Sequence, residues 1–230
     1  MNFPFHIAKR YYRSRKKDNV INIISRVAIA GVAVGTAALI IVLSAFNGIE
    51  NLVISLYNTF DPEIKIQATV GKSFDSEHPN IEKIKNLEGI AAYSEVVEEN
   101  ALLKYKDKQY IARIKGVENN YLNISRIDTT IIAGDFNIGM KGMDNCVMGY
   151  GVAIHLGINL NDISRPVQVY VPGRKKSVTA NPMDAFKARQ FFPAGVFSIQ
   201  HDFDSKFVFT SIDFVRDILD YEGQTMALEI

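Results

Sequence analysis

The chain has 230 residues, of which 47% are hydrophobic, and its 26 basic residues nearly balance its 25 acidic ones. With a net charge of +1, the chain lacks the strong positive field that is typical of nucleic-acid-binding proteins. A single cysteine, Cys146, excludes an intramolecular disulfide, so any folded domain must be held together by packing alone.

The first 26 residues are basic and amphipathic. On a helical wheel, residues 3–15 separate an apolar side from a basic side, which is the pattern of a short helix lying in a membrane interface. The alternative is a frayed basic tail. The apolar side holds Phe5, Ala8, Tyr11 and Tyr12, and the basic side holds Lys9, Arg10 and Arg13.

Residues 27–49 are predicted to cross a membrane. The stretch Val27–Phe46 has twenty residues without a charge, and a helix of that length reaches roughly 30 Å, the thickness of a bilayer's hydrocarbon core. Only Thr36 and Ser44 interrupt the apolar surface, and both can bond to the helix backbone. A buried core helix and a cleaved signal peptide are the alternatives. The span is too long for the apolar region of a signal peptide.

The flanking charges predict the orientation of this helix. Residues 1–26 carry a net charge of +6, and residues 27–230 carry −5. Because cytoplasmic flanks are enriched in Lys and Arg, we expect the N-terminus in the cytoplasm and the remainder of the chain across the membrane.

Gly31 and Gly35 form a GxxxG pair inside the span. Such pairs let two membrane helices approach closely, so these residues are predicted to pack against another helix. The alternative is that glycine is simply common in membrane helices.

Beyond the span, residues 50–60 keep helical spacing and are predicted to form a stalk that ends before Asp61-Pro62, because proline disfavours a helix at the preceding residue. The next segments indicate an α+β domain. They are a strand at residues 63–70, a helix at 78–88 with Ile81, Ile84 and Leu87 inward, and strands at 90–103 and 109–117 joined by a turn at Lys106–Lys108.

Residues 118–165 are less regular, apart from a helix at 150–156 that ends at Gly157. A polar, basic connection at residues 172–189 is too long for a tight turn, and loops of this length are usually functional or disordered. The remaining predicted elements are strands at 166–171, 191–199, 207–210 and 225–230, and a helix at 211–219 capped by Ser211. Because the last strand is cut short, we expect the natural chain to continue past Ile230.

The residues give no indication of catalysis. Gly71-Lys72-Ser73 lacks the earlier glycine of a phosphate-binding loop, since position 66 is Ile. His6, His78, His155 and His201 share no metal-ligand spacing. No nucleophile elbow accompanies His201-Asp202. We therefore predict no catalytic, metal or cofactor site, and a chain that is not an enzyme.

Several motifs together resemble the lipoprotein-releasing ABC transporter permeases of the LolC/LolE type, which belong with the MacB-like and FtsX-like permeases. The N-terminal part of this resemblance is the basic segment at residues 5–17, followed by Ser25, Gly31, Gly35, Ala37 and Ala38 and the ending Leu43-Ser44-x-x-Asn47-Gly48. Its external part is Lys115–Glu118, Met148–Ile158, Val167–Pro172, Ala194–Phe197, Phe203-Asp204 and Phe207–Phe209.

The resemblance implies a permease with four transmembrane helices and a periplasmic domain between the first and second. Residues 50–117 and 201–230 would form a porter-like module with an inserted, mostly β subdomain at 118–200. The N-terminus would be cytoplasmic and residues 50–230 periplasmic, in the inner membrane of a Gram-negative bacterium. The implied partners are a cytoplasmic ATPase subunit, a second permease subunit, a lipoprotein substrate and a periplasmic lipoprotein carrier.

The resemblance also implies two contact regions. The outer end of the first helix would lie near the bound lipoprotein, at Leu43, Phe46, Asn47 and Ile49. The connection at 172–189 would match a loop that grips the carrier, with Pro172, Arg174, Lys175, Lys176, Val178, Pro182 and Met183 as candidate contacts. Where the family tends to carry Gly-Asp, this chain has Asn161-Asp162, and the loop lacks a motif that distinguishes carrier-binding from lipoprotein-binding permeases.

Two other functions remain open. Within the superfamily, the chain could serve MacB-like mechanical efflux or FtsX-like regulation of cell-wall hydrolases. Outside it, the chain could be a single-pass anchored sensor or structural protein.

Overall fold

The computed structural model describes residues 3–13, 20–58, 62–140, 143–162, 164–173 and 186–230. They belong to two compact units, Met1–Ser55 and Leu56–Ile230, and each unit is described by itself. The first is helical, and the second contains all of the described strands.

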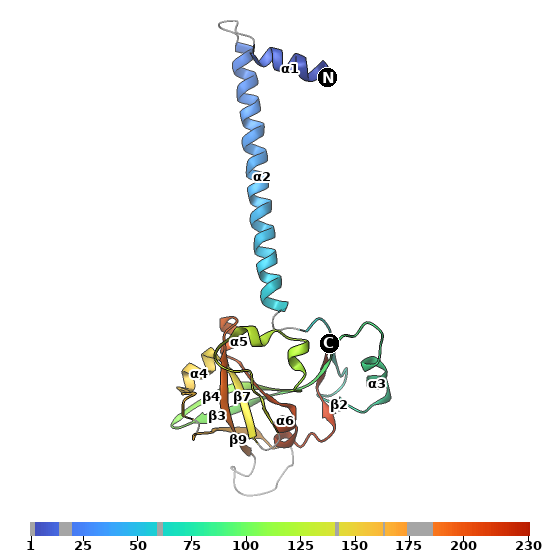
Figure 1. Ribbon diagram of the computed structural model, residues 1–230, viewed down its shortest axis with the longest axis vertical. Helices are drawn as coiled ribbons and strands as arrows, with labels where there is room; N and C mark the ends of the chain where they lie inside the picture. Colours follow the sequence, from blue (N-terminus) through green and yellow to red (C-terminus); the bar gives the residue numbers. More distant parts are fainter. Residues whose placement is uncertain (1–2, 14–19, 59–61, 141–142, 163, 174–185) are drawn as a thin grey trace. The chain divides into compact units, whose positions relative to one another are not determined.

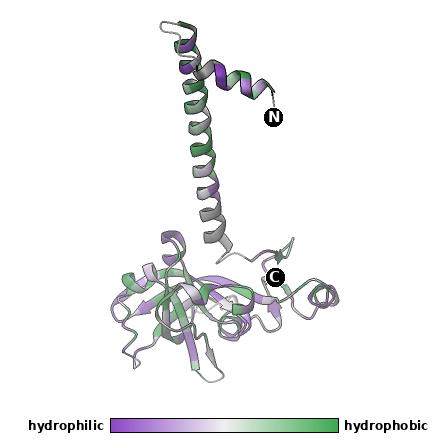
Figure 2. Ribbon diagram, turned by 45° about the horizontal axis from the view of Figure 1, so that its top comes forward, coloured by the Kyte–Doolittle hydropathy of each residue, from purple (hydrophilic) through white to green (hydrophobic). Residues whose placement is uncertain are grey.

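The apolar segment forms one uninterrupted helix (Figure 1). α2 runs from Val20 to Asn58, and its part Asn22–Glu50 is long and apolar enough to cross a membrane (Figure 2). None of the apolar window is buried within the chain, so α2 is not the core helix of the folded unit. As expected, Thr36 bonds back to the helix, with Oγ1 2.9 Å from the carbonyl oxygen of Val32. The predicted continuation of the helix is confirmed as far as Asn58, and its role as a stalk outside the membrane stays a prediction.

The amphipathic segment at the start of the chain is also helical. α1 spans Phe3–Arg13, and Phe3, Phe5 and Ile7 are exposed. The helix is therefore confirmed, and its position in a membrane interface stays a prediction.

In the second unit, six strands pair in a closed ring. β8 pairs with both β3 and β9, so the ladders run β3–β4–β10–β7–β9–β8 and return to β3. The pairs β4–β10 and β7–β9 are parallel, and the other four are antiparallel. The strands are β3 (Ser94–Tyr105), β4 (Lys108–Val117), β10 (Phe207–Ser211), β7 (Met143–Gly149), β9 (Phe186–Phe197) and β8 (Val167–Pro172).

The inside of this ring is an apolar core. In β8 the buried residues alternate with outward-facing ones, as expected for a strand with one packed face. One hydrophobic cluster takes buried side chains from all six strands, which places these residues inside the ring. Examples are Leu103, Ile114, Val208, Met148, Phe191 and Val169.

Two helices complete this core, and both were predicted. α4 spans Tyr150–Leu156 and ends at Gly157, whose φ of 69° suits glycine. α6 spans Ile212–Leu219, and the Ser211 hydroxyl accepts a hydrogen bond from the Phe214 amide at 3.2 Å. α6 crosses β4 so closely that a Cβ on Gly116 would lie 2.8 Å from Val215 Cγ2.

Shorter elements cover the outside of the ring. The 3₁₀ turns η1 (Tyr121–Asn123) and η2 (Ile127–Thr130) carry Tyr121 and Ile127 into a second apolar cluster with Phe197 and Phe209. The remaining elements are β5 (Ile131–Gly134) beside β9, β6 (Gly139–Met140) beside β7, and α5 (His201–Asp204).

The two ends of the unit meet beside β3. β12 (Ala227–Glu229) pairs with β3 on one side and with β1 (Lys65–Gln67) on the other. A two-stranded ladder of β2 (Phe74–Asp75) and β11 (Gln224–Thr225) and the helix α3 (Pro79–Lys85) complete this region.

The structure corrects several predicted boundaries. The strand at 63–70 is only Lys65–Gln67, because only these residues pair with β12. The strand expected from Ile90 begins at Ser94, and Leu87, expected inward, is 58% exposed because α3 has already ended. The strand expected at 225–230 is divided between β11 and β12.

The α+β fold class is confirmed. The division at residues 118 and 200 stays a prediction, and the strands between these positions belong to the same sheet as β3 and β4.

A half-buried polar cluster joins the helices α3 and α6 to the start of β3. Glu95 lies 2.7 Å from Lys85 Nζ of α3 and 2.5 Å from Arg216 Nη2 of α6. Its backbone N–H donates to Glu118 Oε2 at 3.1 Å. Burial, reinforced by the nearby Glu95 carboxylate, raises the pKa of Glu118 above the usual range of a glutamate.

The raised pKa of Glu118 predicts a measurable pH dependence of stability. The folded state holds this proton to a higher pH than the unfolded chain, so ionisation lowers the free energy of unfolding as pH rises through the raised pKa. Glu118→Gln should remove this loss, making the variant more stable than the parent at pH 7 by less than about 1 kcal/mol, because water screens a half-buried group. Urea unfolding of residues 56–230 between pH 4 and pH 7 measures the difference.

Glu118→Ala is the matched control. It removes the same titration but leaves the Glu95 N–H without its acceptor, so its pH dependence should also flatten while its stability falls at every pH. A pH dependence unchanged in Glu118→Gln would contradict this account.

Candidate partner-binding site

β8 and β9 form an arm whose end is fixed by the ladder. Their antiparallel register runs from Val167 opposite Phe191 to Pro172 opposite Phe186. The predicted connection at 172–189 is therefore shorter than expected, because residues 186–189 belong to β9. Pro172 is the last residue of β8. The other candidate contacts of the loop lie outside the described residues: Arg174, Lys175, Lys176, Val178, Pro182 and Met183.

The cations on the inner side of this arm are already paired. Lys187 forms an ion pair with Asp220, which follows α6. Arg189 lies 2.9 Å from Asp144 and also pairs with Asp217 of α6. These contacts hold β9 to α6, so Lys187 and Arg189 serve the fold.

The outer side of the arm continues into an apolar row across four strands. Tyr170 lies opposite Leu102 of β3 and Ala188 of β9, and Leu102 lies opposite Ile111 of β4. Ile111 is 69% exposed and Phe186, at the end of the arm, is 52% exposed. We name Ile111, Leu102, Tyr170, Ala188, Pro172 and Phe186 the outer apolar row.

A groove lies beside this row. Its volume is about 500 Å³, and Tyr170, Ala188, Phe192 and the exposed Met143 contribute to its walls. Two pairs of polar residues in the groove contact each other: the Tyr170 hydroxyl donates to Gln168 Oε1 at 2.9 Å, and Arg189 lies 2.9 Å from Asp144. An exposed apolar surface of this kind commonly marks a site of protein association.

Cations border the outer apolar row. A second hollow, of about 340 Å³, is lined by Lys104, Lys106 and Arg165 together with Ser164. Arg165 is partly neutralised by Asp162 at 3.2 Å. Lys104 lies opposite Gln168, two positions along the ladder from the Leu102–Tyr170 pair of the row. The surface thus combines an apolar centre with a basic margin, which suits a protein partner with an acidic rim.

Sequence reasoning identified the loop and missed the outer apolar row. The alternation in residues 167–172 could have shown that Tyr170 faces away from the buried valines. No sequence pattern indicates that Ile111 and Leu102 lie beside it, since the pairing of β8 with β3 joins distant segments.

The predicted residues of α2 lie on an open helix surface. A Cβ added to Gly31 or Gly35 would meet nothing within 4 Å, so this face is free to pack against another helix. Leu43, Phe46 and Ile49 are each more than half exposed, and Asn47 is exposed. The roles of all these residues in helix packing and in lipoprotein contact stay predictions.

The described residues contain no cluster of three or more His, Cys, Asp or Glu side chains that could hold a metal ion. Two of the histidines have structural contacts. His78 accepts a hydrogen bond from the Asn80 amide at the start of α3, and His155 stacks on Tyr110 with ring centroids 4.8 Å apart.

Comparison with known proteins places the chain in a family. The family model of the MacB-like periplasmic core domain matches residues 25–213. The chain is 29% identical over 166 residues to the lipoprotein-releasing system transmembrane protein LolE of Haemophilus influenzae, covering 70% of this chain and 40% of that protein. It is 27% identical over 168 residues to LolC of Neisseria meningitidis, covering 72% of this chain and 39% of the relative.

The chain therefore spans about two fifths of the length of these relatives. Among solved structures, the extracellular domain of the transporter YknZ aligns with a TM-score of 0.43 at 11% identity, over 69% of this chain and 73% of that domain. The periplasmic region of MacB from Actinobacillus actinomycetemcomitans aligns with a TM-score of 0.43 at 13% identity, over 71% of this chain and 64% of that region. On the match of the family model, the chain belongs to the family of MacB-like periplasmic core domains.

Proposed function

We propose that this chain is part of a permease subunit of an ABC transporter, and that the transporter extracts lipoproteins from the inner membrane and passes them to a periplasmic carrier. The observation that carries the proposal is the family match, which includes both the apolar helix and the folded unit. The names of the two relatives, lipoprotein-releasing system transmembrane proteins, support the lipoprotein substrate.

In this proposal, α2 transmits movement between the membrane and the folded unit. Its 39 residues would extend roughly 58 Å at 1.5 Å per residue, nearly twice the hydrocarbon thickness of a bilayer. The basic residues before α2 support a cytoplasmic N-terminus, and the folded unit would then be periplasmic. ATP hydrolysis would occur in a separate cytoplasmic subunit, and this chain would have no catalytic role.

Two regions of α2 would contact other molecules within the membrane. The open face at Gly31 and Gly35 would pack against a helix of a second permease subunit. Leu43, Phe46, Asn47 and Ile49 would lie beside the lipoprotein. Each is exposed on the helix surface, as that role requires.

The carrier would bind at the end of the β8–β9 arm. The loop between Pro172 and Phe186 contains Arg174, Lys175 and Lys176, which would attract an acidic partner. The outer apolar row begins at the base of this loop and would supply the apolar part of the interface. MacB-like efflux and FtsX-like regulation of cell-wall hydrolases remain the competing functions, and each implies a different partner.

Charge reversal in the loop tests the carrier contact. We expect residues 56–230 to capture a lipoprotein carrier from a periplasmic extract, identified by mass spectrometry. The variant Arg174→Glu/Lys175→Glu/Lys176→Glu should bind it at least tenfold more weakly. The control Lys83→Glu/Arg126→Glu/Lys206→Glu reverses three exposed cations elsewhere and should bind as the parent does. Capture of an efflux adaptor or a cell-wall hydrolase in place of a carrier would refute lipoprotein transfer.

The outer apolar row gives a separate prediction. Ile111→Ser/Phe186→Ser should weaken carrier binding at least tenfold while changing the free energy of unfolding by less than about 0.5 kcal/mol, because both side chains are exposed. Leu122→Ser/Ile132→Ser removes two exposed apolar side chains outside the row and should leave binding unchanged. Calorimetry measures the affinity of each variant for the carrier. If Ile111→Ser/Phe186→Ser binds the carrier as tightly as Leu122→Ser/Ile132→Ser does, the outer apolar row is not part of the interface.

A further inference from the structure

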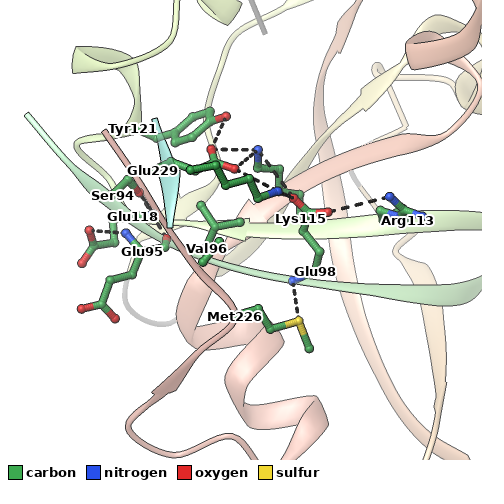
Figure 3. A network of polar contacts seen from close by, with 12 residues as sticks. Ser94, Glu95, Val96, Glu98, Arg113, Lys115, Glu118, Tyr121, Met226 and Glu229 are labelled. Atoms are coloured by element: carbon green, nitrogen blue, oxygen red, sulfur yellow. Dashed lines mark hydrogen bonds and ion pairs between the residues drawn. The ribbon is translucent and has the colours of Figure 1, made fainter. Parts of the chain in front are cut away.

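A buried ion pair lies where the two ends of the folded unit join the sheet. Lys115 Nζ of β4 lies 2.9 Å from both carboxylate oxygens of Glu229 in β12 (Figure 3). Lys115 is 1% exposed and Glu229 is fully buried. The Tyr121 hydroxyl donates to Glu229 Oε2 at 3.3 Å, so the carboxylate is bound from two sides.

Aromatic rings enclose the lysine. Its ammonium group lies 5.2 Å from the centroid of the Tyr121 ring and 5.9 Å from that of Phe209. Removing two charges from water costs several kcal/mol per ion, and apolar residues of similar volume are often as stabilising as a buried pair. The inside of the strand ring, in this same protein, is filled by apolar side chains. Stability alone therefore does not explain the charged pair.

The strands that this pair joins are short. β12 holds β3 and β1 by ladders of three residues each. Ile64 and Ile230 extend the β1 ladder, with reciprocal backbone hydrogen bonds of 3.2 and 2.9 Å. Among the described strands, β1 pairs with β12 alone, so its backbone pairing reaches the ring of strands through β12.

The ion pair reaches across an intervening strand. Lys115 belongs to β4 and Glu229 to β12, and β3 lies between these two strands. Lys65 of β1 adds to the network, lying 3.5 Å from Glu229 and 3.3 Å from Glu98 of β3. Side-chain contacts thus connect all four strands in the order β1, β12, β3 and β4, alongside the short ladders.

We propose that Lys115, Glu229 and Tyr121 form a clasp that fixes β12, and through it β1, to the strand ring, so that movement of α2 reaches the ring. α2 ends at Asn58, and β1, which begins at Lys65, is the first strand after it. Along the chain, movement of the helix therefore reaches β1 first, and the ladder of β1 with β12 connects it to the clasp. This inference rests on the proposed transport function, and the three residues act as positioning residues.

The test replaces the clasp by apolar groups of similar size. Lys115→Met/Tyr121→Phe/Glu229→Met leaves no buried charge unpaired at these positions, so the folded unit should keep its melting temperature. Glu229→Gln alone leaves Lys115 with only the more distant carboxylate of Glu98, at 3.7 Å, and should destabilise the unit. The control Lys72→Met/Glu99→Gln removes an ion pair that lies outside β1, β12 and the outer apolar row.

Two readouts separate a clasp from a merely stabilising pair. In the full-length protein, hydrogen exchange at the backbone amides of β1 and β12 should be at least tenfold faster in the triple variant than in the parent or the control. In the reconstituted transporter, the triple variant should hydrolyse ATP at the parent rate but release at least tenfold less lipoprotein per ATP. Parent-like exchange in β1 and β12, or parent-like release per ATP, would overturn the clasp.

The two readouts also distinguish the clasp from the transport function on which it rests. If the parent transporter releases no lipoprotein with ATP, the proposed function fails. The exchange measurement still decides whether these residues hold β1 and β12 to the ring.

Discussion

The pairing of β8 with both β3 and β9 is the constraint on which the folded unit depends. It closes six strands into a ring and gives each of these strands an inner and an outer face. The inner faces make one apolar core with α4 and α6. On the outer faces, the same register aligns Ile111, Leu102, Tyr170 and Ala188 in one row. One set of ladders thus both stabilises the unit and positions the proposed partner surface.

Two kinds of interaction hold the two parts of the sheet. The ring is held by apolar burial, which is strong, tolerant of small changes and independent of direction. The strands that receive the chain from α2 are held by short ladders and by ion pairs around Glu229, Lys115 and Lys65. Charged contacts of this kind depend on a particular geometry and are lost when strands shift by one residue. This difference suits the proposed transmission of movement from α2 to the ring.

Local sequence patterns predicted much of the fold. The long charge-free run predicted α2, the Ser211 cap and Gly157 predicted ends of α6 and α4, and two alternating segments predicted the β3–β4 hairpin. What these patterns could not give is pairing between distant strands, because periodicity records which face is buried and not which strand lies alongside. The closed ring, the early start of β9 and the outer apolar row all depend on such pairing. Lys115 is a second feature that local patterns could not predict. A lysine in a strand is expected at the surface, but Lys115 is buried and pairs with Glu229, which lies far along the chain.

The most direct test of the account is release of lipoprotein from a bilayer. Full-length protein would be reconstituted into proteoliposomes with its partner permease and ATPase subunits and a labelled lipoprotein, and carrier would be supplied on the side of the folded unit. The account predicts that labelled lipoprotein moves from the bilayer to the carrier with ATP and remains in the bilayer with a non-hydrolysable analogue. ATP hydrolysis at a normal rate, with all of the lipoprotein retained in the bilayer, would contradict it.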